Sequence, residues 1–351
     1  MQMQSQLLTD FNTLREQNPK IRAVDAAARL GVSEGALLEA RTHGEEVERL
    51  VGRGADLGKL IEGLKLVGRV MTLTRNPAVV HETKGEVLDV QVNGAMGQVV
   101  GPIDLRMFLR HWHIAYHVTE QTKSGLRKSF QIFDLHGSSV IKIYAVDQAD
   151  KAAWDALHHA YVDISKAITF FSQPEAKKED RPDTEIDVSE MRTRWNALEH
   201  SHDFFRILAD LQVGRQQALR LAGPELAQPL PTSAIRTMLE SVSAQEIPIM
   251  CFVGNPGCIQ IFSGPVRTVA EMGQWLNILD PDFNLHLRQD MVAQAGLVRK
   301  PTGLRGRITS LECFNAGGEM VCQFFGARPP GEPEREDWRA AMESLTEEPV
   351  S

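Results

Sequence analysis

The segment WNALEHSHDFFRIL, residues 195–208, contains two histidines in a pattern that otherwise predicts one amphipathic helix. Side chains three and four positions apart share one face of an α-helix, which places His202 on the apolar face and His200 on the opposite, exposed face. The predicted apolar face consists of Trp195, Leu198, His202, Phe205 and Leu208. An imidazole there has two interpretations: a core histidine satisfied by a backbone carbonyl, or a ligand of a metal or cofactor.

Arg106 and Phe108 form a second candidate pair, in IDLRMFLR (residues 103–110). Alternate residues of an extended segment share a face, so a guanidinium and an aromatic ring would lie side by side. The alternative is a surface arginine above a core phenylalanine. More cations stand beside turn residues in RKPTG (299–303) and GARPPGEPE (326–334), and the second of these segments predicts a rigid loop. No phosphate-binding glycine loop, G-x-S-x-G elbow or H-E-x-x-H pair occurs, so these enzyme classes find no support.

Composition predicts a packed, soluble protein with two domains of ordinary size. The chain has 351 residues, 42% hydrophobic and 24% charged. No apolar run approaches the roughly 18 residues of a membrane span and no leader pattern is evident, so we expect a cytoplasmic protein without membrane insertion. A formal net charge of −8 argues against a general nucleic-acid binder. The four cysteines form no C-x-x-C pair and lie in apolar, strand-like segments, which predicts buried, reduced thiols.

The chain contains an internal repeat. RVMTLTRNPAVVHETKGEV (69–87) aligns with PIMCFVGNPGCIQIFSGPV (248–266) at an offset of 179, and residues 128–144 align with 309–325 at an offset of 181. Between them, IDLRMFLR aligns with PDFNLHLR (281–288) at an offset of 178. So long a period, used twice, indicates duplication of a whole domain. Each half has helices, then short strands with hairpin-length turns, then a closing helix, so we predict an α+β fold with antiparallel sheets.

We predict an N-terminal repeat over residues 1–171, an exposed linker over 172–187, and a C-terminal repeat over 188–351. Residues 23–41 have the pattern of a helix-turn-helix, but residues 205–223 repeat it. A packing corner of two helices explains both copies, and DNA contact by the N-terminal copy is the alternative.

The two copies differ at positions that we take to be functional, because a duplicated fold keeps its core by necessity. The histidine segment occurs only in the second copy. The alignment places Arg215 over Glu34, Gln323 over Lys142, and Asn284 over Arg106.

Several segments resemble a known family: the HemS-type cytoplasmic haemin-transport and haemin-degrading proteins of Gram-negative haem-uptake systems. The most specific are WLNILDPDFNLHLR (275–288), VRKPT (298–302), TSLECF (309–314) and FFGARPPGEPE (324–334). In the first half, MTLTRNPAVVHE and IDLRMFLRHW are similar too. The resemblance extends from about residue 50 to residue 338.

The resemblance implies that each half is a helical layer beside a curved antiparallel sheet. It implies haem b (iron protoporphyrin IX) as the ligand, held between the C-terminal sheet and helix and a segment of the N-terminal half. The family's axial histidine stands in W-x-A-L-x-x-x-H-x-F, which gives His202 as the iron ligand, with His200 as an alternative. The other implied haem-binding residues are Arg106, Phe108, Arg215, Phe252, Lys300, Gln323 and Arg328. A tyrosine that some members carry before the glutamine is Cys322 here.

These residues suit haem chemically. A neutral imidazole binds haem iron when its other nitrogen is held by a hydrogen bond. Arginine and lysine offer the two propionates charge-assisted hydrogen bonds of about 1.5–3 kcal/mol each. We therefore expect a cytoplasmic haem-binding protein that receives imported haem and passes it to downstream use or degradation, with an inner-membrane haem importer and a haem oxygenase as partners.

Two other functions remain open. One is a haem-degrading enzyme that opens the porphyrin with peroxide or dioxygen and an electron donor. The other is a duplicated scaffold that binds only proteins.

Overall fold

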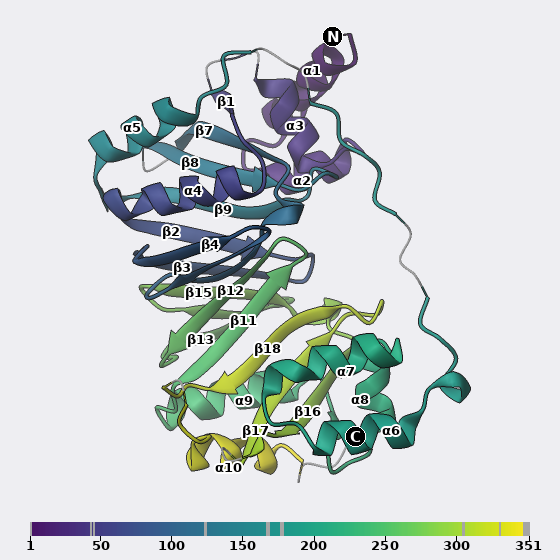
Figure 1. Cartoon of the computed structure of the whole chain (residues 1–351). Coiled ribbons are helices and arrows are strands. Elements are labelled where there is room, and N and C mark those ends of the chain that lie inside the picture. The colour runs from purple at the N-terminus through teal and green to yellow at the C-terminus, as the bar shows by residue number, and fades with distance from the viewer. Residues whose placement is uncertain are drawn as a thin grey trace. The chain divides into compact units, whose positions relative to one another are not determined.

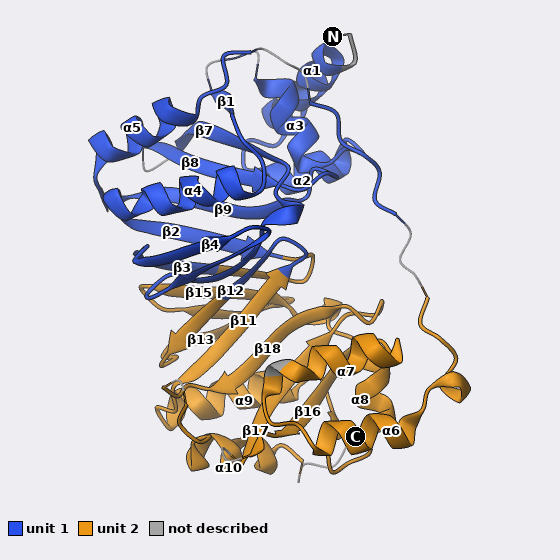
Figure 2. Ribbon diagram, viewed as in Figure 1, with its two compact units in different colours: residues 1–75, 82–175, 255–260 blue, residues 76–81, 176–254, 261–351 orange. Residues whose placement is uncertain are grey.

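The computed structural model of the chain describes residues 2–42, 44, 46–122, 125–165, 169–175, 179–303, 306–329 and 331–346. The chain divides into two compact units (Figure 2). Unit 1 comprises residues 1–75, 82–175 and 255–260, and unit 2 comprises residues 76–81, 176–254 and 261–351. The predicted halves thus supply most of each unit, and each unit also contains six residues of the other half.

Unit 1 is a mixed helix and sheet structure (Figure 1). Its helices are α1 (Gln2–Gln17), α2 (Ala23–Arg29), α3 (Glu34–Arg41), α4 (Ala55–Gly63) and α5 (Lys151–Tyr161), with 3₁₀ turns η1 (Leu64–Leu66) and η2 (Leu109–His111). One run of strands has the order β1 (Val47–Leu50), β7 (Ile114–Thr122), β8 (Gly125–Phe133), β9 (Ser139–Ala149), β2 (Gly68–Arg75) and β3 (Val79–Glu86), of which β3 begins in unit 2. A second run is β6 (Asp104–Phe108), β5 (Met96–Val100) and β4 (Asp89–Asn93). In the first run, each strand from β1 through β7, β8 and β9 to β2 pairs antiparallel with the next. In the second run, β5 pairs antiparallel with both β4 and β6.

Unit 2 repeats this order of elements. Its helices are α6 (Val188–Asn196), α7 (Phe204–Leu211), α8 (Arg215–Ala222), α9 (Ala234–Ala244) and α10 (Glu336–Ser344), with 3₁₀ turns η3 (Asp183–Glu185), η4 (Ser201–Asp203) and η5 (Gln289–Met291). One run of strands is β10 (Ala227–Leu230), β16 (Gln294–Pro301), β17 (Arg307–Phe314), β18 (Met320–Gly326), β11 (Ile249–Asn255) and β12 (Cys258–Gly264). The second run is β15 (Phe283–Arg288), β14 (Trp275–Leu279) and β13 (Val269–Met272). The predicted α+β class with antiparallel sheets is confirmed. No helix in the described ranges is long and apolar enough to cross a membrane.

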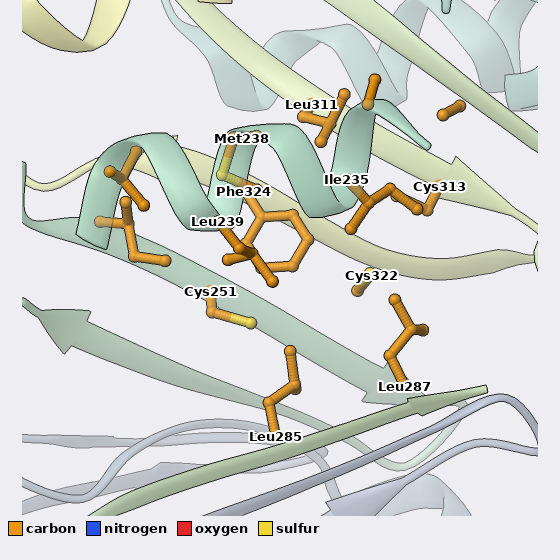
Figure 3. Packing of buried hydrophobic residues seen from close by; sticks show 14 of the residues in the cluster. Ile235, Met238, Leu239, Cys251, Leu285, Leu287, Leu311, Cys313, Cys322 and Phe324 are labelled. Carbon is orange, nitrogen blue, oxygen red and sulfur yellow. The ribbon is translucent and has the colours of Figure 1, made fainter. Parts of the chain in front are cut away.

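The core of unit 2 forms where α9 and α10 cover one face of the sheet. Buried α9 residues recur at helical spacing, as in Ile235, Met238 and Leu239, and meet Cys251 of β11 and Phe324 of β18 (Figure 3). The four cysteines of the chain are free and buried, as predicted.

Each closing helix carries a tryptophan. Trp338 of α10 is fully buried, and its indole N–H donates to the Thr309 carbonyl at 3.0 Å. It packs so closely on Gly326 that a Cβ there would lie 2.6 Å from the ring. In unit 1, Trp154 of α5 stacks on Phe130 with ring centroids 4.4 Å apart. The two tryptophans therefore fix the closing helices to their sheets.

The exchanged segments begin with equivalent asparagines. Asn255, in unit 1, donates from Nδ2 to the Val140 carbonyl at 2.8 Å, and Asn76, in unit 2, donates to the Val321 carbonyl at 2.8 Å. In both, Oδ1 accepts backbone N–H groups two and three residues later, which closes the turn. The Asn-Pro pairs aligned by the repeat are therefore structurally equivalent.

The predicted register of the repeat around Arg106 is wrong. The amide of Phe108 donates to a carbonyl of the exchanged segment in unit 1 at 3.0 Å, and the amide of Arg288 makes the same bond in unit 2 at 2.8 Å. The segment thus repeats at an offset of 180, and Arg106 corresponds to His286, not to Asn284. A slip of two residues leaves every side chain of a strand on its own face, so the alternation pattern does not detect it.

The predicted single helix over residues 195–208 is also wrong. Helix α6 ends at Asn196, the turn η4 follows, and α7 begins at Phe204. The interruption shifts the helical phase by one position, so Phe204 is buried and Phe205 is 61% exposed. Trp195, Leu198 and Leu208 are buried as predicted.

Candidate ligand-binding site

A carboxylate is completely buried within unit 2. Glu312, on β17, accepts a forked pair of hydrogen bonds from Arg215, at 2.8 Å from Nε and 2.7 Å from Nη2. Lys300 Nζ donates to the same carboxylate at 3.0 Å, and Ser310 Oγ donates at 3.1 Å. We call these four residues the Glu312 cluster. Because two cations face one carboxylate, the cluster carries a net positive charge.

The pKa shifts agree with a fully charged cluster. Burial by itself raises the pKa of Glu312, but the charges of Arg215 and Lys300 outweigh burial and hold that pKa below its ordinary value. Burial lowers the pKa of Lys300 to about 8, against the attraction of Glu312. Both groups are therefore mainly ionised at neutral pH.

Helix α7 supports the two cations with an aromatic ring. Phe204, its first residue, is fully buried, and its ring centroid lies 5.2 Å from the Arg215 guanidinium carbon and 5.1 Å from Lys300 Nζ. The exposed Phe205 ring lies 5.2 Å from the same guanidinium carbon. Cation–π contacts of this kind contribute about 0.5–2 kcal/mol each. The first turn of α7 thus helps to fix the positions of both cations.

The histidine segment is anchored on both sides of η4. Before it, the Trp195 indole N–H donates to the Arg299 carbonyl at 3.0 Å, one residue before Lys300. After it, the Phe204 ring lies 4.3 Å from the Trp195 ring, centroid to centroid. His202 lies in η4, and its side chain is outside the described part of the structure. His200 is exposed, as predicted.

An aromatic and amide surface adjoins the Glu312 cluster. The strand register places Phe252 of β11, Gln323 of β18 and Glu312 of β17 in one row across the sheet. Phe325, two residues beyond Gln323 and so on the same face, meets Phe252 edge to face at 5.1 Å and lies 5.9 Å from Lys300 Nζ. Phe252, Gln323 and Phe325 are half-buried. This face has the chemistry to receive a flat, aromatic ligand with acidic groups.

The structure therefore brings together four of the predicted residues: Arg215, Phe252, Lys300 and Gln323. Arg328 is half-buried, two residues beyond the end of β18. Cys322 is fully buried and belongs to the hydrophobic core on the other face of the sheet from Gln323 (Figure 3). The side chain at position 322 is thus directed away from the face that carries Glu312.

Arg106 and Phe108 belong to unit 1. On β6 they share a half-exposed face, as predicted, while Leu105 and Met107 are buried. Arg106 forms an ion pair with Asp104, on the same strand and face, and donates to the Val99 carbonyl at 3.4 Å. Phe108 is half-buried.

Unit 1 contains a counterpart of the Glu312 cluster with the polarity reversed. There the buried carboxylate is Glu34, on α3, and Lys142 of β9 and Arg75 of β2 pair with it. Gln131 occupies the position of Glu312 and donates to Ser129 at 3.0 Å. Hence the differences seen between the copies in the sequence move the carboxylate from the helix to the sheet.

Sequence reasoning missed Glu312 and Phe204. A signal for Glu312 was present, because a single acid inside the apolar strand TSLECF requires a partner of opposite charge once it is buried. Phe204 was assigned to the wrong face because the break between α6 and α7 was not predicted.

A second cluster of titratable side chains lies against α5 in unit 1. Glu48 Oε2 lies 2.9 Å from His158 Nε2 and 3.7 Å from His117 Nδ1, a grouping that resembles a metal centre. However, the Trp154 indole N–H donates to His117 Nε2 at 3.2 Å. The neutral ring then carries its proton on Nδ1, the atom that a metal would need. His117 in this tautomer therefore offers no lone pair to a metal on the side of Glu48.

Comparison with known proteins identifies relatives along nearly the whole chain. The haemin-degrading HemS/ChuX domain family matches residues 31–161 and 212–345. Hemin transport protein HmuS of Yersinia pestis is 33% identical over 354 residues, which cover 99% of this chain and 100% of that protein. The crystal structure of holo-PhuS, a heme-binding protein from Pseudomonas aeruginosa, is 40% identical with a TM-score of 0.93, covering 97% of this chain and 98% of that one. ChuS, a heme degrading enzyme of Escherichia coli O157:H7, is 35% identical with a TM-score of 0.89, covering 97% and 99%.

Proposed function

Because the chain belongs to the haemin-degrading HemS/ChuX domain family, we propose that it binds haem b, receives it after import, and passes it on for use or degradation. The Glu312 cluster carries this proposal, since it sets a net positive charge beside a half-buried aromatic surface. Haem combines a flat apolar ring with two carboxylates, which are the groups that this face suits. The residues present thus fit the ligand.

The residues have separate roles in this proposal. His202 holds the iron through one ring nitrogen, and the exposed His200 is the alternative ligand during transfer. Arg215, Lys300 and Arg328 bind the propionates, each with a charge-assisted hydrogen bond of about 1.5–3 kcal/mol. Phe252 and Gln323 contact the ring, and Arg106 and Phe108 are further haem-binding residues from unit 1.

Haem titration tests the proposal. We expect haemin to give a Soret band that His202→Ala shifts, with an affinity at least tenfold lower. Arg215→Ala should weaken binding by about 10–100-fold without shifting the band, because it removes a carboxylate partner and not an iron ligand. The matched control is His159→Gln, which changes an exposed histidine of α5. Equal bands and affinities for the wild type and the double variant His200→Ala/His202→Ala would contradict the assignment.

Haem degradation is the second candidate, because ChuS is described as a heme degrading enzyme and is 35% identical. Carriage and degradation differ in their products. A single turnover with an electron donor in the presence of catalase should leave the porphyrin intact in a carrier. Formation of a biliverdin-type product under these conditions would assign ring opening to the protein itself.

The carrier role implies partners. We propose a cytoplasmic location, where an inner-membrane haem importer supplies haem and a haem oxygenase accepts it. Pull-down of the haem-loaded protein against that of His202→Ala tests whether partner binding depends on the bound haem.

A further inference from the structure

A groove of about 570 Å³ opens on unit 1 beside the start of α4, the turn η2 and the turn between β8 and β9. Its volume lies within the roughly 300–1,000 Å³ of small-molecule sites. Leu109, Leu135 and Pro256 line it with apolar surface, and Leu135 is 47% exposed. Arg53, Arg110 and the imidazoles of His111, His113 and His136 line the rest, together with Asp134. The groove thus combines apolar surface with basic groups.

His136 is held in the orientation of a metal ligand. Its Nδ1 lies 3.1 Å from the Ser172 carbonyl oxygen and 3.0 Å from Ser172 Oγ, so Ser172 holds this side of the ring. In the tautomer that donates from Nδ1 to the carbonyl, the neutral ring has its lone pair on Nε2. Asp134 fixes the turn by accepting from the amides of His136 at 2.9 Å and Ser138 at 2.8 Å. Histidines that bind metals are oriented by this same donation to a backbone carbonyl.

The groove suits iron in a porphyrin better than a bare metal ion. A bare zinc ion in a protein takes three or four side-chain ligands, whereas haem iron already has four ring nitrogens and needs one. Among the described residues, the only group of three such ligands within 4.8 Å of one another is Glu48, His117 and His158, outside the groove. A single oriented imidazole is therefore what the groove offers.

The two arginines supply charge for acidic groups. Arg53 and Arg110 are exposed at the groove, and Arg110 Nε donates to His111 Nε2 at 3.0 Å, which uses one of its five N–H groups. Burial and Arg110 lower the pKa of His111, and burial and Arg53 lower that of His113, so both rings are neutral at pH 7. The charges of Arg53, Arg110 and Asp134 sum to one net positive charge at the groove.

This chemistry is specific to unit 1. A unit 2 pocket that includes Thr232 and Gln289, the counterparts of Arg53 and Leu109, has a volume of about 170 Å³, and none of the residues that line it is basic. Thr232, Asp290 and Gly317 stand at the positions of Arg53, Arg110 and His136. Since the duplicated fold does not require these side chains, their presence in one copy points to a ligand.

We infer that this groove is a second, haem-docking site, in which His136 Nε2 binds the iron and Arg53 and Arg110 bind the carboxylates. The inference rests on the proposed function, because haem is then a ligand that the protein already handles. A carrier needs a place where haem is held while it enters or leaves the principal site. A site with one axial ligand and exposed arginines, as here, permits such exchange.

The test uses the full chain with haemin and with metal-free protoporphyrin IX. We expect two haemin molecules per wild-type chain, and one per chain of His200→Ala/His202→Ala. In that double variant, adding His136→Gln should shift the remaining Soret band and lower the affinity for haemin at least tenfold, while the affinity for protoporphyrin IX stays unchanged. Adding Arg53→Ala/Arg110→Ala to the double variant should lower the affinity for both haemin and protoporphyrin IX at least tenfold. The matched control is His159→Gln, and His136→Asn is the second variant should His136→Gln fail to fold by circular dichroism.

The outcomes separate the two claims. If the wild type binds one haemin and the double variant binds none, the groove is not a haem site, while the proposed function stands. If the double variant keeps one haemin that neither His136→Gln nor His136→Asn affects, the groove is also refuted as an iron site. If the wild type binds no haemin, the proposed function fails and this inference fails with it.

Discussion

Acid should destabilise unit 1 through His117, and His117→Gln should remove this effect. His117 is 3% exposed between β7 and α5, and burial, together with the neighbouring His158, lowers its pKa to about 3. In the unfolded chain a histidine has a pKa of about 6.5. Between these values the unfolded state binds one proton more than the folded state, so stability falls as pH falls. The stabilisation is complete above pH about 6.5 and declines toward pH about 3.

The magnitude follows from the width of that window. Each pH unit inside it changes the free energy of unfolding by about 1.36 kcal/mol. Lowering the pH from 7 to 5 crosses about 1.5 units of the window and should cost about 2 kcal/mol. Glutamine does not titrate, and its amide oxygen can accept the Trp154 N–H in place of Nε2.

Urea unfolding at pH 7, 6 and 5, followed by tryptophan fluorescence and circular dichroism, measures the effect. The difference in unfolding free energy between wild type and His117→Gln should shift by about 2 kcal/mol over this range, because contributions common to both proteins cancel. His159→Gln, on the exposed face of α5, should keep the wild-type dependence. Parallel pH profiles for wild type and His117→Gln would refute the reasoning.

Two other predictions concern the polar cores. Glu312→Gln leaves Arg215 and Lys300 buried without their anion, so the urea midpoint should fall by an amount equivalent to about 3–5 kcal/mol of unfolding free energy. Glu34→Gln should cost a similar amount in unit 1. Unchanged midpoints would show that neither cluster depends on its carboxylate. Asn255→Ala removes an acceptor of two amides and a donor to buried carbonyls, for an expected loss of about 2–4 kcal/mol. Asn76→Ala should cost about the same, and a large inequality between the two in thermal unfolding would contradict their structural equivalence.

Much of the fold was predictable because it depends on patterns that repeat. The duplication, the order of helices and strands, and the buried thiols all follow from periodicity and composition. The break after Asn196 was not predictable from periodicity, because the apolar spacing continues through η4 as if the helix did. The register around Arg106 failed because strands keep their faces through a slip of two.

The site was predictable in its residue types and less so in their partners. Arg215 and Lys300 come from segments 85 positions apart in the chain, and only the folded sheet shows that both meet Glu312. Likewise, nothing in the local sequence around His136 shows that its Nδ1 lies against Ser172, 36 residues away. Such long-range contacts fix which atoms of a side chain remain available for a ligand.

The two clusters have the same net charge and differ in which element carries the carboxylate. Glu34 lies in the first turn of α3, where a carboxylate is favoured by the helix dipole, and the unit 1 cluster follows that rule. In unit 2 the first residue of α8 is Arg215, a cation where the dipole disfavours one by about 0.3–1 kcal/mol. Glu312 compensates for this by accepting the forked pair of hydrogen bonds from Arg215. Proteins tend to break such local rules at functional sites. In the proposed function, Arg215 is the cation that an acidic ligand meets near Phe252 and Gln323, whereas the first turn of the equivalent helix in unit 1 holds the carboxylate Glu34.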